Sequence, residues 1–191
     1  DSPVYPDYLT HRLNNEDCDP VACRIRHFEE IGYFNNKVNV VYIPCYLDGD
    51  DGIVNVGYYD LLPALDLTVF PSYYEPWGYT PLESIAFGVP TVTSDKSGFG
   101  QWILGNFADD ITVSGVKVIE RTDSNYEVAA EAIACQIAAQ RDASESEIAE
   151  ARKAATATAA KADWALFAEY YDKAFAIAQS RASERRAKTN K

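Results

Sequence analysis

The chain has 191 residues, an apolar fraction of 47% and a net charge of −12 at pH 7, which suits one ordinary domain with a buried core. This acidic balance argues against a nucleic-acid partner, because such a surface needs Lys and Arg along the phosphates. No signal peptide opens the sequence and no apolar run could span a bilayer, so we expect no membrane partner and a cytoplasmic location. The chain begins at Asp1 and lacks Met, which indicates a piece of a longer protein.

The sequence offers few of the His and Cys ligands that zinc prefers. It holds only His11 and His27, and the cysteines show no CxxC spacing, so we expect no zinc site and no cofactor. Scattered thiols are typical of the reducing cytoplasm, and we expect these cysteines to be small buried apolar residues. The cysteines are Cys18, Cys23, Cys45 and Cys135.

In chain order, short β-branched runs alternate with helical stretches. Asp19 followed by Pro20 predicts a helix start, because aspartate is a favoured N-cap and proline is favoured at the first helical position. Strands are expected at residues 38–43, 67–70, 90–93 and 116–119, and helices at 21–31, 59–65, 81–87 and 126–140. This alternation predicts βαβ units and therefore an α/β fold with a doubly wound parallel sheet.

The C-terminal third is expected to be helical. Residues 144–161 are Ala-rich and charged, which favours an exposed helix, whereas 163–178 should dock through one aromatic stripe. That stripe consists of Trp164, Phe167, Tyr171, Ala174 and Ala178. We expect the domain to cover residues 1–179 and the basic residues 180–191 to form a frayed tail.

The most informative run is VFPSYYEPWGYTPLE at residues 69–83. Thr80 suits an N-cap, Pro81 suits the first helical position, and Glu83 completes a capping box. A strand, a glycine-containing loop and a helix N-terminus form an anion site, in which Gly78, Tyr79 and Thr80 offer backbone N–H groups. Because the chain is acidic, these groups must do much of the anion binding, unless cations come from elsewhere.

Two carboxylates and a second glycine run lie near this site. Glu75 stands in an aromatic-rich loop where α/β sheets place ligands, so we interpret it as functional, whereas the cap explains Glu83. The run Ser97–Gly100 follows another strand and either faces the same crevice or forms a plain turn. A glycosidase is discounted, because Glu83 would not point across a sugar from Glu75.

The runs FPSYYEPWGYTPLE and GVPTVTSDKSGFG resemble glycogen synthases of the eukaryotic type, which are retaining glucosyltransferases of family 3 with the two-lobed GT-B fold. The likeness is close over residues 69–100 and weaker over 10–178. It implies the Rossmann-like C-terminal lobe, which binds UDP-glucose. The complete enzymes of this family add glucose to glycogen or another α-1,4-glucan without a metal.

The resemblance also implies roles for individual residues. Glu75 would be catalytic, beside the transferred glucose, and Glu83 would bind the ribose. The backbone of Gly78, Tyr79 and Thr80 would bind the pyrophosphate. Tyr58 would stack on uracil. The aromatic neighbours Tyr74 and Trp77 complete the expected substrate-binding set.

Two departures from the family bear on activity. The family's catalytic Arg and Lys come from upstream of Asp1 and its acceptor lobe is missing, so this chain is predicted to be inactive without that N-terminal lobe. The family's Arg-rich sensor of glucose 6-phosphate is replaced by mixed charges over 140–162, which indicates a bacterial, unresponsive member. Another nucleotide sugar, or a non-catalytic binding module, stays an alternative, and a homo-oligomer is left open.

Overall fold

The computed structural model describes residues 8–33 and 38–189. The chain divides into two compact units, Asp1–Leu61 and Leu62–Lys191. Across the described residues, no helix is long and apolar enough to cross a bilayer.

In the first unit, the predicted helix start is confirmed. The unit contains the short turn η1 (Glu16–Cys18), α1 (Pro20–Glu30) and α2 (Tyr58–Leu61). The carboxylate of Asp19 accepts hydrogen bonds from the N–H groups of Val21 and Ala22, which caps α1. One face of α1 packs into a small core formed by Tyr8, Leu9, Ala22 and Ile25.

The predicted strand at residues 38–43 is wrong. Within the described residues this segment pairs only through an isolated parallel bridge between Leu9 and Tyr42. Val38 and Val41 are 54% and 64% exposed, so the apolar run is not covered on both faces. Its composition favoured a buried strand, but a strand forms only where a neighbouring segment of the chain pairs with it through continuous backbone hydrogen bonds.

The second unit holds a parallel three-stranded sheet in the order β1-β2-β3, formed by β1 (Thr68–Phe70), β2 (Thr91–Ser94) and β3 (Val116–Ile119). Its other elements are η2 (Leu62–Ala64), α3 (Tyr79–Ala86), α4 (Gly98–Asn106), α5 (Ile111–Ser114), α6 (Tyr126–Asp142), α7 (Glu145–Ala159), η3 (Ala160–Ala162) and α8 (Trp164–Thr189). The predicted doubly wound α/β fold is confirmed. The helix expected at 59–65 is divided between α2 and η2.

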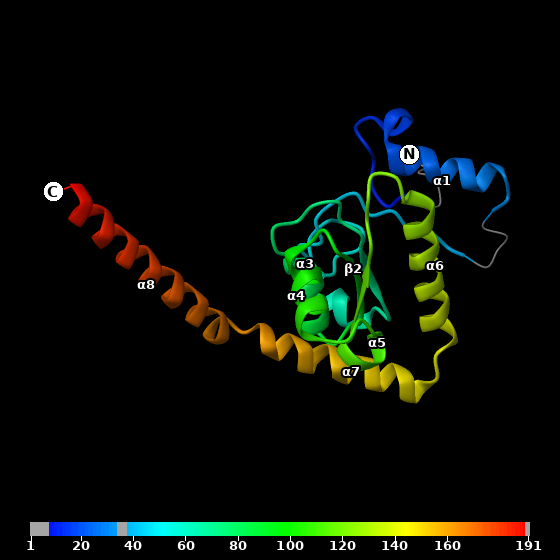
Figure 1. The fold of residues 1–191 in the computed structure, drawn as a ribbon. Helices are drawn as coiled ribbons and strands as arrows, with labels where there is room; N and C mark the ends of the chain where they lie inside the picture. The colour runs from blue at the N-terminus through cyan, green and yellow to red at the C-terminus, as the bar shows by residue number, and fades with distance from the viewer. Residues whose placement is uncertain (1–7, 34–37, 190–191) are drawn as a thin grey trace. The chain divides into compact units, whose positions relative to one another are not determined.

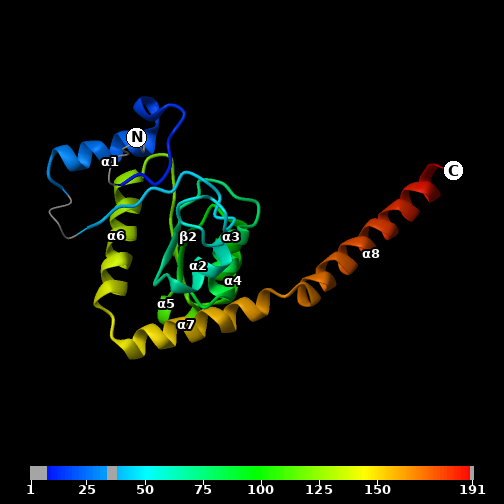
Figure 2. The same ribbon diagram turned by 180° about the vertical axis from the view of Figure 1, so that it is seen from behind.

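Helices cover both faces of the sheet, so the side chains that alternate along each strand are buried on either side. Val116 and Val118 point into a core with Ile85 of α3, Phe99 of α4 and Ala155 of α7. Val92 of β2 and Ile119 of β3 point to the opposite face and pack against Ala129 of α6. Figure 1 and Figure 2 show the same arrangement, with α3 and α4 on one side of β2 and α6 on the other.

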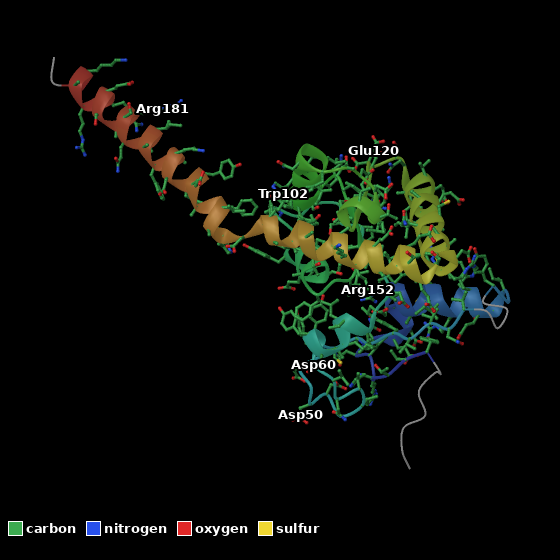
Figure 3. The ribbon with its side chains drawn as sticks, turned by 90° about the horizontal axis from the view of Figure 1, so that it is seen from below. Asp50, Asp60, Trp102, Glu120, Arg152 and Arg181 are labelled. Carbon is green, nitrogen blue, oxygen red and sulfur yellow. The ribbon has the colours of Figure 1, made fainter. Side chains whose placement is uncertain are left out.

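α7 is less exposed than its composition predicted. It buries Ala151, Ala155 and Thr158, and Gly115 at the end of α5 lies directly against Ala155. Arg152, labelled in Figure 3, donates from Nη2 to the Leu65 carbonyl at 2.6 Å. Alanines without a strong apolar pattern can still form a close helix contact, because small side chains let backbones approach.

The docked aromatic stripe predicted for α8 is wrong. Trp164 and Tyr171 are 60% and 53% exposed, and Ala174 and Ala178 are exposed as well. Of the stripe only Phe167 is half-buried, with its ring 5.5 Å from that of Trp77. The helix also continues as far as Thr189, so most of the basic stretch from residue 180 is helical. Residues 190–191 of that stretch lie outside the described residues.

Candidate functional site

The loop after β1 and the start of α4 are joined at the carboxyl edge of the sheet. Glu75 forms an isolated parallel bridge with Ser97. Its N–H donates to the Lys96 carbonyl at 3.2 Å, and its own carbonyl accepts from the Gly98 N–H at 3.0 Å. The glycine run therefore borders the same edge as Glu75. Glycine is needed at position 98 because an added Cβ would overlap the Pro76 carbonyl.

The capping box predicted for Thr80 and Glu83 is wrong. α3 begins at Tyr79, two residues earlier than expected, with Gly78 as its N-cap and no side-chain cap. Gly78 has φ of +113°, a conformation that side chains rarely adopt, so the chain can turn into the helix here. Pro81 then falls within the first turn, where its missing N–H breaks no helical bond.

This helix start leaves donors open. The N–H groups of the N-cap and of the first three helical residues have no partner inside a helix. In α3 these belong to Gly78, Tyr79, Thr80 and Pro81, and proline has no N–H. Over the part of the chain that the structure describes, the three remaining N–H groups donate to no protein acceptor. They form the kind of cluster that binds a phosphate or carboxylate.

The Glu75 carboxylate lies beside this cluster. A Cβ added to Gly78 would stand 3.5 Å from Glu75 Oε2, and the Ser72 hydroxyl donates to the same oxygen at 3.2 Å. The partial positive charge of the helix N-terminus favours a carboxylate at this place. The edge therefore combines a held acid side chain with open amide donors.

The aromatic residues of the loop divide into anchors and exposed rings. Trp77 packs among Phe99, Trp102 and Phe167, with ring centroids 5.5–6.0 Å apart. Packing explains Trp77, so its predicted substrate contact stays a prediction. By contrast, Tyr74 is 80% exposed. Tyr79 lines an apolar pocket of about 280 Å³ together with Trp77, Leu82, Ala162, Trp164, Phe167, Tyr170 and Tyr171.

The remaining predicted residues lie further from the loop in sequence. Glu83 is half-buried in the second turn of α3. Tyr58 is half-buried at the start of α2, in the first unit. Their expected contacts with ribose and uracil stay predictions.

Sequence reasoning missed Arg121, two residues beyond β3. It is only 6% exposed, and its guanidinium lies 4.0 Å from the centroid of the Tyr73 ring. Its Nε is buried and has no hydrogen-bond partner within residues 8–33 and 38–189. The available signal was a basic residue just after the carboxyl end of a strand in an acidic chain.

Asp95 fixes the backbone at this point. Its Oδ1 accepts the Arg121 N–H at 2.8 Å, and its Oδ2 lies 2.6 Å from Lys96 Nζ. Burial acts to raise the pKa of Asp95, but the Lys96 ammonium and the Arg121 N–H outweigh it, and the pKa falls below the ordinary value. Asp95 therefore stays ionised and already has a cation beside it.

One group of metal-ligand types lies in the first unit. Donor atoms of His11, Cys45 and Asp51 all lie within 4.8 Å of one another. Ordinary hydrogen bonds account for the group: His11 contacts the Thr10 hydroxyl at 2.8 Å, and the Asp51 carboxylate accepts three backbone N–H groups from residues 53–55. We therefore assign no metal to it.

The prediction that the cysteines are buried is wrong. Cys18, Cys45 and Cys135 are exposed, Cys23 is half-buried, and all are free thiols.

A parallel sheet covered by helices on both faces, with helix N-termini at its carboxyl edge, defines a doubly wound α/β protein of the class that binds ligands at that edge. The particular family follows from comparison with known sequences. The family model described as glycogen synthase matches residues 2–190. The chain belongs to the glycogen synthase family of glycosyltransferases.

Curated relatives agree over part of the chain. It is 38% identical to the liver glycogen [starch] synthases of Mus musculus and Homo sapiens over 119 residues, which is 61% of this chain and 16% of each relative. It is also 38% identical to glycogen [starch] synthase isoform 1 of Saccharomyces cerevisiae over 98 residues, or 51% of this chain and 14% of that protein. The matched segment is thus a small part of each relative.

Proposed function

We propose that this chain is the UDP-glucose-binding lobe of a retaining glucosyltransferase that elongates an α-1,4-glucan. The observation that carries the proposal is the cluster of open N–H groups at Gly78, Tyr79 and Thr80 beside the Glu75 carboxylate. A nucleotide sugar has a diphosphate next to its reacting sugar carbon. Such a ligand matches an anion site with an acid side chain at its side.

The chemistry divides between the two parts of this site. Transfer breaks the bond between the sugar carbon and the diphosphate, so negative charge grows on the leaving phosphate. Amide donors fixed by the helix stabilise that charge without reorganising during the reaction. Glu75 lies at the sugar side, where a carboxylate orients hydroxyls and stabilises positive charge on the sugar carbon. Glu83 and Tyr58 are proposed to bind the ribose and uracil.

Turnover is proposed for the complete protein only, in the cytoplasm, with a second lobe that holds the neutral glucan. The matched segment covers 16% or less of the curated relatives named above, so the acceptor site must come from elsewhere in such enzymes. We expect no transfer from UDP-glucose to glycogen by the 191-residue chain alone. A rate equal to that of the complete protein would contradict this part of the proposal.

Glu75→Gln in the complete protein tests the enzyme role. Removing the charge while keeping the shape should lower kcat by about a hundredfold or more, because the loss falls on the transition state. UDP affinity, measured by calorimetry, should change little. The matched control is Glu127→Gln, at an exposed position of α6, and it should leave both kcat and the UDP affinity unchanged.

Calorimetry also separates the alternatives. Tight binding of UDP with weak binding of ADP supports the uridine nucleotide, and the reverse order would assign another donor. If Glu75→Gln keeps full activity, the catalytic role is wrong, and a binding module becomes the better reading.

A further inference from the structure

Arg121 is a buried cation for which the described residues provide no acidic partner. It is 6% exposed in a chain with 29 acidic and 17 basic residues, yet no ion pair among the described residues includes it. The Nε–H group of Arg121 is buried as well, and no acceptor for it lies among the described residues. A charge removed from water is costly unless it is paired, so such a group calls for a ligand.

Its position connects it to the candidate donor site. Arg121 follows the carboxyl end of β3, and its guanidinium reaches the ring of Tyr73 at 4.0 Å. Tyr73 belongs to the loop after β1 that also carries Glu75. The same loop leads into the open N–H groups at the start of α3. Arg121 therefore approaches, from a different strand, the loop on which the site is built.

Neither of its contacts satisfies the charge. The cation–π contact with Tyr73 occupies no N–H group of the guanidinium, and it contributes only about 0.5–2 kcal/mol. Asp95 accepts only the backbone N–H of Arg121, and its carboxylate is paired with Lys96. A guanidinium with open N–H groups can bind a planar pair of anionic oxygens through paired hydrogen bonds.

We propose that Arg121 binds a phosphate group of the nucleotide-sugar donor. The inference rests on the proposed function, in which glucose and glucan are neutral and the diphosphate is the only anion. Arg121 would supply, from within this lobe, a cation for the phosphate in a chain that is otherwise acidic. Tyr73 acts as a positioning residue, because its ring lies against the guanidinium and restricts its movement.

The test compares Arg121→Gln and Arg121→Lys in the complete protein, with Arg141→Gln as the control. Arg141 is also an arginine but is exposed on α6 and pairs with Asp142. Calorimetry measures the binding of UDP, uridine and inorganic pyrophosphate to each variant. We expect Arg121→Gln to weaken UDP and pyrophosphate by about ten- to a hundredfold, since a charged hydrogen bond is lost, and to leave uridine unchanged.

Arg121→Lys keeps the charge but loses the paired donors, so it should lie between the wild type and Arg121→Gln. It also keeps the test decisive if the glutamine variant does not fold. Unchanged UDP affinity in a folded Arg121 variant would overturn the proposal. An equal loss for UDP and uridine would overturn it too, because the effect would then concern the pocket and not the phosphate.

The pyrophosphate arm separates the two proposals. If the wild type binds pyrophosphate through Arg121 but does not distinguish UDP from ADP, the uridine donor is wrong and the phosphate contact stands. If UDP binds tightly and no Arg121 variant changes it, the donor assignment stands and Arg121 has no part in it.

Discussion

Gly78→Ala is the sharpest test of how α3 is aimed at the sheet edge. Gly78 has φ of +113°, and an added Cβ would lie 3.2 Å from Pro81 Cγ and 3.3 Å from Phe99 Cβ. A non-glycine residue in such a conformation costs about 1–3 kcal/mol. Phe99 is fully buried and Pro81 is rigid, so neither neighbour can move away without disturbing the core. We therefore expect a loss of about 2–3 kcal/mol in the free energy of unfolding.

Gly105→Ala is the matched control. Gly105 lies in α4, and nothing stands within 4 Å of its added Cβ. Alanine is preferred to glycine in a helix by about 0.5–1 kcal/mol, so this variant should be slightly stabilised. Both variants add the same methyl group, and only the backbone conformation and the surroundings differ.

Urea unfolding followed by circular dichroism measures both variants against the wild type. The difference of about 3 kcal/mol between them corresponds to more than a hundredfold in the folded-to-unfolded ratio. Equal stabilities for the two variants would refute the left-handed N-cap at Gly78. A large loss for Gly105→Ala alone would show that α4 packs where the structure leaves it open.

Three further results are expected. Gly115→Ala should destabilise the chain by about 2–4 kcal/mol, because its Cβ would overlap Ala155 at a φ of +74°, and unfolding by urea measures the loss. Asp95→Asn should cost about 1–2 kcal/mol at pH 7. Since the folded pKa of Asp95 is lowered, this cost is present above the ordinary pKa of 3.8 and should disappear as the pH falls through the folded value, and unfolding curves from pH 7 to pH 3 test the sign. Ser144→Ala should cost about 1 kcal/mol, as it removes the hydroxyl that caps α7 opposite Glu147, and a thermal melt that does not change would contradict this role.

Strands and caps that depend on local sequence could be predicted. Val116–Ile119 was found at its expected bounds, and the Asp19 cap starts α1 as its residue types require. The segment at 38–43 has the same β-branched composition and yet is no strand. The composition of a segment shows whether its side chains suit a strand. It does not show whether another segment lies beside it to form the backbone hydrogen bonds.

The presence of a helix start after the Glu75 loop could be predicted, but its construction could not. Thr80, Pro81 and Glu83 match a helix start by residue type, but the positive φ of Gly78 lets the helix begin earlier. That conformation depends on the packing of the loop against Phe99, which lies on another helix. Arg121 was missed for a related reason, because its burial against Tyr73 joins segments about fifty residues apart in sequence.

The bridge between Glu75 and Ser97 has an entropic consequence. Two main-chain hydrogen bonds, Glu75 N–H to Lys96 and Gly98 N–H to Glu75, fix the loop on both sides of the acid side chain. A loop that must be ordered on binding loses conformational freedom and gives up part of its affinity. Here most of that ordering is completed when the chain folds, so a ligand meets a carboxylate whose backbone is already in place.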